Sequence, residues 1–373
     1  MASRVFFTDI RASSHKDSLP KKVRSLFDRA EFRKLFGVDE LVAVKIHFGE
    51  KGNLGFIHPV LVRQVVDKVK EYKGKPFLVD TNTLYVGSRS NTVDHLETAL
   101  ANGFSYASAG APLIIADGLF GKNYLEVEVN QRHFEKVKIA SDIFNAPSMI
   151  VMSHVKGHIA AGFGGALKNL GMGCANRGGK QMMHSVVKPE VNGENCTGCA
   201  VCLKWCPVEA ISMNQGDKKA VLDRNLCIGC GECTAACQFD AIKIRWQSET
   251  DQLQERMVEF ALGAVKTKPK KVGYINFVIN VTPDCDCHPW SDAPIVPDVG
   301  ILASMDPVAL DQASLDLINQ QTGLVGTKLT TNFTPGQDKF SGIREKIDHR
   351  VQLKYAEEIG LGVRNYELIE IKL

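Results

Sequence analysis

The 373-residue chain has no long hydrophobic run and only a small excess of positive charge. Its first residues lack the apolar core of a secretory signal peptide, and no stretch approaches the about 18 apolar residues that a membrane-spanning helix needs. A formal net charge of +3 is too small to indicate nucleic acid or an anionic membrane as a partner. These absences predict a soluble cytoplasmic protein in a reducing compartment, with no nucleic-acid partner and no membrane span.

The sequence also lacks two motifs that mark nucleotide-binding proteins. The glycine-rich segment at residues 162–180 contains no G-x4-G-K-[ST] P-loop, and it does not fit the dinucleotide fingerprint that follows a strand. No flavin or nicotinamide site can therefore be read from the chain. Its composition, with 44% hydrophobic and 23% charged residues, is that of an ordinary globular protein long enough for two domains.

Cysteine, in contrast, is abundant and regularly spaced. Eight of the eleven cysteines form two copies of the spacing C-x2-C-x2-C-x3-C, and the copies are offset by 31 residues. A tight loop with three thiolates at this spacing can hold three corners of a cubane iron-sulfur cluster, so the fourth ligand must come from elsewhere. The duplication therefore indicates two clusters of the 4Fe-4S type.

In bacterial two-cluster ferredoxins, the fourth cysteine of each run binds the cluster of the other run. The first cluster is then expected on Cys196, Cys199, Cys202 and Cys237, and the second on Cys227, Cys230, Cys233 and Cys206. Structural zinc needs only two separated pairs of ligands, and disulfides need an oxidising compartment, so both alternatives explain the spacing less well. Oxygen-labile clusters also point to an anaerobic organism.

Residues 189–245 as a whole resemble bacterial two-cluster ferredoxins. Apolar residues follow each fourth cysteine, at 208–211 and 239–242, where they predict short strands against the clusters. One departure is Gln238, which replaces the proline that usually follows the last cysteine, a change that affects loop rigidity and not ligation. Basic and acidic residues balance over this segment, so strong charge steering of a redox partner is not expected.

Strand and helix patterns alternate on both sides of the cysteine segment. Strands are predicted at residues 42–46, 76–79, 112–116, 148–152 and 272–279, helices at 60–72, 92–102, 251–265 and 307–320, and a closing helix and strand within 352–371. Repeated strand-helix units imply a mostly parallel sheet with helices on both faces. The predicted fold is an α/β domain of residues 1–187 and 247–373, interrupted by a small α+β ferredoxin-like insert at 188–246.

Polar side chains gather directly after four of the predicted strands. The candidate catalytic residues are His47, Glu50, Asp80, Asn82, Asp117, His154, Lys156 and His158. In open parallel sheets ligands bind at the carboxyl ends of the strands, so these side chains are expected around one crevice. Histidine could transfer protons there, and Lys156 could balance a small anionic substrate. Any one of these residues taken alone is more often a turn residue or a helix cap than a functional residue.

The glycine-rich segment lies between this crevice and the cysteine runs. Its backbone N–H groups could cradle an anion, with Lys168, Arg177 or Lys180 supplying positive charge. A tightly packed linker is the alternative interpretation.

Three cysteines remain outside the two runs. Cys174 lies in the glycine-rich segment, and Cys285 and Cys287 form a C-x-C-H motif with His288 after a predicted strand. Thiolates and an imidazole in one loop can face one ion, so these residues could bind a third metal, cluster or redox group, with His288 as the fourth candidate ligand. The alternative is a small buried thiol and a plain structural turn.

Taken together, these motifs resemble the iron-sulfur-centre proteins of domain-of-unknown-function family 362. The segments that carry the resemblance are the two cysteine runs and residues 45–53, 80–83, 87–89, 117–118, 154–158, 162–171, 297–300 and 306–309. The resemblance implies a two-cluster ferredoxin insert in an α/β domain and a low-potential redox role. It implies no general reaction.

Three classes of function fit these predictions. The first is a ferredoxin-coupled oxidoreductase, in which the clusters exchange electrons with a substrate or cofactor at the strand ends. The second is a pure electron carrier whose α/β body docks protein partners, such as a ferredoxin or an oxidoreductase subunit. The third is a non-redox iron-sulfur assembly or sensor protein. The size of the body and its polar strand ends favour a body that binds a ligand.

Overall fold

A central sheet organises the computed structural model, which describes residues 2–85, 87–184, 188–227, 232–239, 241–243 and 250–372. The eight strands run in the order β16-β1-β15-β14-β7-β2-β3-β4. Their bounds are β1 Ser3–Asp9, β2 Leu41–Lys45, β3 Lys75–Asp80, β4 Leu113–Ile115, β7 Ser148–His154, β14 Val272–Val278, β15 Gly300–Ser304 and β16 Tyr366–Glu370. Within this sheet β15 is antiparallel to both of its neighbours, and all other pairs are parallel.

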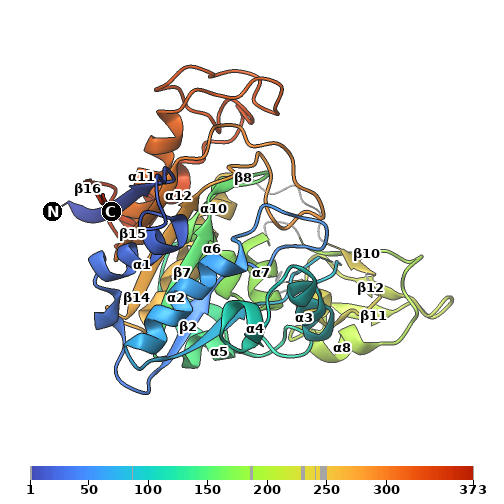
Figure 1. Ribbon diagram of the computed structural model, residues 1–373. Coiled ribbons are helices and arrows are strands. Elements are labelled where there is room, and N and C mark those ends of the chain that lie inside the picture. The colour runs from blue at the N-terminus through green and yellow to red at the C-terminus, as the bar shows by residue number, and fades with distance from the viewer. Residues whose placement is uncertain are drawn as a thin grey trace.

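Helices cover both faces of this sheet, which confirms the predicted α/β fold class (Figure 1). One face carries α1 Leu19–Arg29, α2 Pro59–Glu71, α3 Thr92–Ala101 and α4 Tyr106–Ala109, and the other carries α6 Ala166–Cys174, α10 Thr250–Lys266, α11 Pro307–Asn319 and α12 Val351–Glu358. Strand β7 shows why both faces need a cover: successive side chains of a strand point to opposite faces of the sheet, and here both sets are apolar. Met149 and Val151 pack in the core under α6 and α10, whereas Ile150 and Met152 pack in the core under α1 and α2.

The strands and helices predicted from periodicity agree with the observed ones to within a few residues. Periodicity did not reveal β1, α1, β15 or the hairpin of β5 Tyr124–Glu128 and β6 Lys136–Ala140. It also did not predict that the first and last strands are neighbours, with Val5 of β1 opposite Leu368 of β16. Pairing between distant segments is a long-range property, which local periodicity does not report.

The start of α6 depends on a close approach between two segments. Asp311 of α11 accepts hydrogen bonds from the backbone N–H groups of Ala166 and Leu167, at 2.7 and 2.9 Å. A side chain at Gly165 would meet the Asp311 carboxylate, because a Cβ there would lie 2.3 Å from its Oδ1. The carboxylate thus caps the helix that carries Lys168 and Asn169 toward the carboxyl ends of the strands.

The cysteine segment forms small elements of its own. They are β10 Glu190–Val191, α8 Val201–Trp205, β11 Ile211–Met213, β12 Ala220–Leu222, α9 Glu232–Ala236 and β13 Ile242–Lys243. Strands β10 and β13 form one antiparallel pair and β11 and β12 another, and in the described part of the chain neither pair joins the large sheet. Figure 1 shows these elements standing to one side of the sheet. An ion pair of 2.5 Å between Lys138 of β6 and Glu232 of α9 connects them to the body.

Candidate functional site

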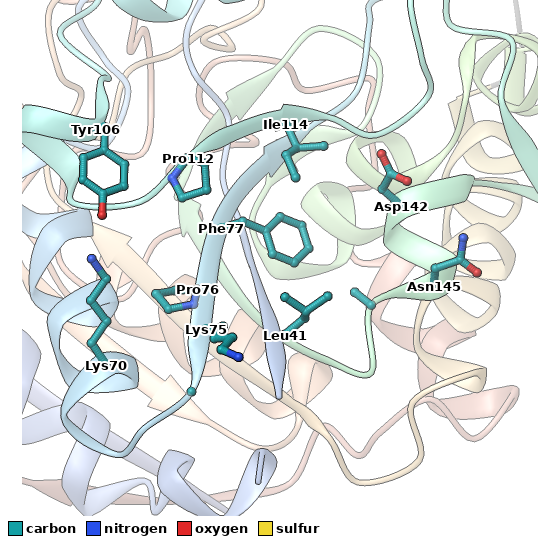
Figure 2. A pocket seen from close by; sticks show the side chains of 12 residues that line it. Leu41, Lys70, Lys75, Pro76, Phe77, Tyr106, Pro112, Ile114, Asp142 and Asn145 are labelled. Carbon is teal, nitrogen blue, oxygen red and sulfur yellow. The ribbon is translucent and has the colours of Figure 1, made fainter. Parts of the chain in front are cut away.

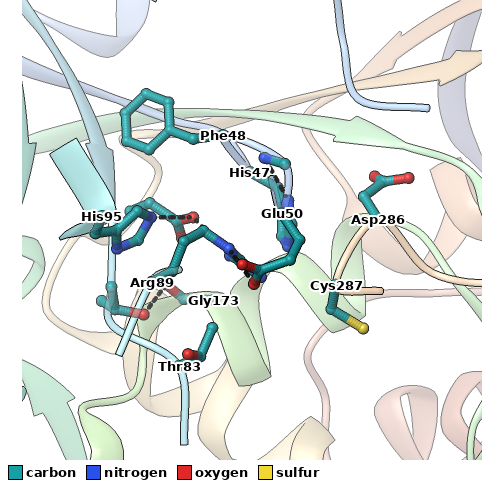
Figure 3. Close-up of polar contacts among 12 residues, drawn as sticks. His47, Phe48, Glu50, Thr83, Arg89, His95, Gly173, Asp286 and Cys287 are labelled. Atoms are coloured by element: carbon teal, nitrogen blue, oxygen red, sulfur yellow. Dashed lines mark hydrogen bonds and ion pairs between the residues drawn. The ribbon is translucent and has the colours of Figure 1, made fainter. Parts of the chain in front are cut away.

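A cavity of about 700 Å³ lies at the carboxyl ends of β2, β3 and β7. Six of the eight candidate catalytic residues line it, namely His47, Glu50, Asp80, His154, Lys156 and His158. Asn82 and Asp117 are not among the described lining residues. They contact each other instead, because the Asn82 side chain donates to Asp117 Oδ1 at 2.9 Å. Figure 3 shows part of this region, with Glu50 and Arg89 beside His47 and the loop of Asp286 and Cys287 opposite them.

Buried ion pairs build the wall formed by β2 and β3. The Lys45 ammonium lies 2.9 Å from Asp80 Oδ1 and 2.8 Å from Asn169 Oδ1. The Arg89 guanidinium lies 3.1 Å from Glu50 Oε2 and 3.7 Å from Asp80 Oδ2. Burial alone would favour protonated Asp80, but the Lys45 ammonium and the His95 ring, 3.6 Å from Oδ2, hold the pKa of Asp80 well below its usual range. The two cations and the two carboxylates neutralise one another, so these side chains hold the wall of the cavity together.

Sequence reasoning did not assign a role to Lys45, Arg89, Asn169 or Asp286. Three of them have a sequence signal, since Lys45, Arg89 and Asn169 lie in segments that carry the family resemblance. Asn169 and Asp286 reach the cavity through α6 and a distant loop, so their place depends on tertiary packing.

The histidines of the cavity are held by backbone and carboxylate contacts. His154 Nδ1 lies 2.9 Å from Asp286 Oδ1, and Lys156 Nζ lies 3.1 Å from Asp286 Oδ2. Despite burial, His154 and Lys156 hold the pKa of Asp286 well below its usual range. Burial lowers the pKa of His47, with the Arg89 cation acting in the same direction, so this imidazole is neutral near pH 7. His47 Nδ1 accepts the backbone N–H of Gly49 at 3.0 Å, so the hydrogen of the neutral ring lies on Nε2, which can donate it to a ligand.

Lys180 and Asp117 are ionisable groups with pKa values displaced toward neutrality. Burial lowers the pKa of Lys180 to about 8, although Asp117 opposes the shift. Burial raises the pKa of Asp117 to about 6, although Lys180 opposes it. The Lys180 ammonium donates to two neutral oxygens, Thr81 Oγ1 at 2.5 Å and Ala175 O at 2.7 Å. It lines the cavity and can contribute positive charge to an anion there.

The structure brings two of the three cations of the predicted anion cradle to the cavity. Lys168 and Lys180 line the cavity, but Arg177 is not among its described lining residues, and its guanidinium donates to Leu84 O at 3.2 Å. The first N–H groups of α6 are already bound by Asp311. An anion in the cavity would therefore meet lysine side chains in place of these backbone donors.

Three potential metal ligands converge beside the cavity. One ligand atom from each of His158, Cys285 and Cys287 lies within 4.8 Å of the other two. Within the described residues this group includes neither Cys174 nor His288, the other two residues predicted for a third site. Cys174 is buried beside Asn169 O, and burial raises its pKa to about 11, whereas the His288 ring stacks on Trp290. Together with the many other cysteines, the group is compatible with metal binding.

The Cys285 sulfur is surrounded by hydrogen-bond donors. A hydrogen bond from the Cys287 thiol lowers the pKa of Cys285 well below its usual range; burial opposes this shift and the Lys168 ammonium adds to it. Lys168 Nζ lies 3.2 Å from Cys285 Sγ. Sequence reasoning placed Lys168 with a bound anion and did not connect it to the C-x-C motif.

In the cysteine segment, one small cavity is lined by thiols from both runs. They are Cys196, Cys199 and Cys202 of the first run and Cys237 of the second. Backbone N–H groups point at two of these sulfurs, from Ala220 to Cys196 and from Ala241 to Cys237, each at 3.4 Å. Burial, with the neighbouring Cys199 and Cys237, raises the pKa of Cys202, as expected for thiols that share one space.

The second predicted ligand set is described in part. Cys230 lies outside the described residues. Of the others, Cys233 is buried, and Cys206 and Cys227 are half-buried. The Cys206 sulfur accepts a hydrogen bond from the backbone N–H of Ala210 at 3.1 Å.

A second large cavity, of about 580 Å³, lies at the opposite edge of the sheet (Figure 2). It is formed at the amino ends of β2, β3 and β4 by mainly apolar side chains, including Leu41, Pro76, Phe77, Pro112 and Ile114. Ligands of open α/β sheets bind at the carboxyl ends of the strands. The polar cavity is therefore the candidate functional site.

An α/β sheet with polar strand ends and a separate cysteine-rich segment defines the general class of this protein. The family model for domain of unknown function DUF362 matches residues 42–316, and the chain belongs to this family. The family resemblance expected from the motifs is thus confirmed. No curated protein matches the chain.

Two solved structures resemble the chain weakly. The lactate racemase apoprotein from Thermoanaerobacterium thermosaccharolyticum has 14% identity and a TM-score of 0.36, covering 69% of this chain and 49% of its own. A crystal structure of a Thermotoga maritima protein has 9% identity and a TM-score of 0.38, covering 93% of this chain and 61% of its own. The chain thus spans about half the length of the racemase. Similarity at this level carries no conclusion about ligand or reaction.

The described part of the chain contains no helix that combines the length and the apolar character needed to cross a membrane.

Proposed function

We propose that this protein is an iron-sulfur redox protein with two 4Fe-4S clusters, which exchange electrons at low potential with a substrate or cofactor in the strand-end cavity. The observation that carries the proposal is the small cavity lined by Cys196, Cys199, Cys202 and Cys237. Thiols of the two runs combine crosswise there, in the ligand set of a two-cluster ferredoxin. The duplicated spacing extends the proposal to a second cluster on Cys227, Cys230, Cys233 and Cys206.

The surroundings of these thiols suit iron-sulfur clusters better than isolated structural cysteines. Sulfurs of Cys196, Cys206 and Cys237 each accept a backbone N–H. Such N–H donors stabilise the negative charge of cluster thiolates and tune the cluster potential. This segment, residues 188–246, is proposed as a ferredoxin-like insert in an α/β domain of residues 1–187 and 247–373.

One helix supports an electron path from the insert to the cavity. Helix α7 Arg177–His184 contributes Lys180 and His184 to the cavity wall. The same helix packs against α9, which carries Cys233. The second cluster would therefore lie on the side of the insert that faces the cavity. Electrons would reach the first cluster from a protein partner, such as a ferredoxin or an oxidoreductase subunit.

The cavity suits a small anionic substrate. Lys156, Lys168 and Lys180 line it, and the neutral imidazole of His47, whose Nδ1 accepts the Gly49 N–H at 3.0 Å, can donate the hydrogen of Nε2 to the substrate. Glu50, Asp80, Asn82, Asp117, His154 and His158 complete the proposed site, either in the wall or directly behind it. This polar cavity favours an oxidoreductase over a pure carrier or a non-redox sensor. A cytoplasmic, anaerobic setting is part of the same proposal.

Iron and sulfide analysis of protein purified without oxygen tests the cluster proposal. The expected content is about eight irons and about eight sulfides per chain. Reduction by dithionite should bleach the visible absorption and give the electron paramagnetic resonance signal of reduced 4Fe-4S clusters. Bound zinc without sulfide would contradict the proposal. Clusters that cannot be reduced and reoxidised would favour a structural or sensor role.

A further inference from the structure

The loop that carries Cys285 and Cys287 is held on both sides by its aspartates. Asp284 Oδ2 forms an ion pair with Lys328 Nζ at 2.6 Å, and the same carboxylate also pairs with Arg344. Asp286 is bound by His154 and Lys156 on the opposite side. The two carboxylates anchor the loop to different parts of the body, so the two thiols between them are held in place.

The loop packs against the strand β8 Lys156–His158 at Gly157. The Gly157 backbone N–H donates to Thr282 O at 2.8 Å. A Cβ at this position would lie 2.1 Å from the backbone oxygen of Pro283, so another residue would push the loop away. This close approach sets Cys285 and Cys287 beside His158.

The Cys285 sulfur accepts hydrogen bonds from two N–H donors. Lys168 Nζ lies 3.2 Å away, and the backbone N–H of Cys287 lies 3.4 Å away. The Cys287 side chain reaches the cavity, whereas Cys285 is only 1% exposed behind it. The arrangement stabilises negative charge on one sulfur and leaves the other accessible to reactants in the cavity.

The hydrogen bonds of His158 disfavour a metal ion at the same place. Its Nδ1 accepts the backbone N–H groups of Ala160 and Ala161, at 3.2 and 3.0 Å. The hydrogen of a neutral ring then resides on Nε2. Neither ring nitrogen offers a free lone pair, whereas a metal-bound imidazole normally donates its second N–H to an acceptor.

We propose that Cys285 and Cys287 form a redox-active dithiol that converts reversibly to a disulfide at the cavity wall. Reduction breaks the S–S bond with two electrons and one proton and yields the Cys285 thiolate, beside the Lys168 ammonium, and the Cys287 thiol. Oxidation forms the S–S bond and releases the same two electrons and one proton. The source of electrons rests on the proposed function, since each 4Fe-4S cluster can supply one electron at a time. The proton enters from water in the cavity.

Such a dithiol would connect the one-electron chemistry of the clusters to two-electron chemistry in the cavity. Each cluster exchanges single electrons, whereas most reductions of small organic molecules need two. A dithiol that stores two electrons would allow a two-electron step after two single transfers. Lys168 is then a positioning residue, because it stabilises the reduced sulfur and need not touch the substrate.

The test is a thiol-disulfide titration of the intact wild-type protein without oxygen. Samples are equilibrated with oxidised and reduced dithiothreitol at a series of ratios, quenched in acid, alkylated and digested with trypsin. The tryptic peptide of residues 272–328 contains only these two cysteines. It should carry either two alkyl groups or none, and the balance should follow the dithiothreitol ratio as a single two-electron couple.

Three variants test which residues control this balance. Cys174→Ser alters the other cysteine outside the runs and should leave the curve unchanged. Lys168→Met removes the cation that stabilises the reduced sulfur, so the disulfide should become favoured by about tenfold, whereas Lys168→Arg should restore most of the wild-type balance.

Two results would overturn the dithiol. One is a peptide that keeps both thiols free at every ratio, even with excess oxidant. The other is a divalent metal that the wild type binds in one equivalent and that Cys285→Ser loses, which would assign His158, Cys285 and Cys287 as metal ligands. Iron and sulfide are measured on the same samples, so failure of the cluster proposal is recognised separately from failure of the thiol pair.

Discussion

Lys45 and Asp80 form an ion pair inside the protein, with 2.9 Å between Nζ and Oδ1. They end neighbouring parallel strands, and their exposed fractions are 0% and 2%. The second carboxylate oxygen of Asp80 faces Arg89 at 3.7 Å and His95 at 3.6 Å. One carboxylate thus joins β2, β3, α3 and the segment around Arg89 into the floor of the candidate site.

Breaking this pair should strongly destabilise the fold. Lys45→Met leaves Asp80 buried without its nearest cation, and the expected loss in the free energy of unfolding is about 3 to 5 kcal/mol. Lys45→Met combined with Asp80→Asn should lose clearly less than the two single losses added together. Urea denaturation of the three variants measures the coupling. Additive losses would show that the pair is not a unit.

The stability of the protein should depend on the titration of Asp117. Its pKa is raised by burial from 3.8 to about 6, so the folded state holds the proton more tightly than the unfolded state. The stabilising effect is complete below pH 3.8 and is lost as the pH rises through 6. Asp117→Asn, which mimics the protonated acid, should therefore gain up to about 3 kcal/mol on the wild type between about pH 4 and pH 7. The charges that face Asp117 are Lys180 and Asp80. Denaturation curves at several pH values test this, and a constant difference between the proteins would refute it.

Substitution of one cluster ligand should remove one cluster and spare the other. Cys199 is exposed, so Cys199→Ser should not disturb packing, and iron should fall from about eight to about four per chain. Cys174→Ser serves as the matched control and should keep all the iron. Loss of all iron from the Cys199 variant, with the fold intact by circular dichroism, would show that the clusters are not independent.

Binding of an anion in the cavity should weaken as Lys180 loses its proton. Because the pKa of Lys180 is about 8, the cation is present below this pH and lost above it. Calorimetric titration with inorganic phosphate should show affinity that falls about tenfold between about pH 7 and pH 9. Lys180→Met should bind weakly at both pH values. Equal binding by both proteins at pH 7 would place the anion elsewhere.

Local sequence patterns by themselves determined much of this protein. Strands such as β2 and β7 and helices such as α2 follow from apolar periodicity, which depends on residues only a few positions apart. The spacing within each cysteine run also depends on residues only a few positions apart, so the sequence alone identified the candidate cluster ligands. The polar residues after the strands also indicated which edge of the sheet carries the cavity, since parallel strands place their carboxyl ends together.

Tertiary structure alone decided which of these residues meet. Lys168 contacts Cys285 across 117 positions of the chain, and His158, in place of Cys174, joins the C-x-C pair. The same holds for Asp286 in the cavity wall and for β1 beside β16. Such contacts depend on strand order and on close approaches such as that at Gly157. Local periodicity records which face of an element is buried, but it does not record which distant segment covers that face.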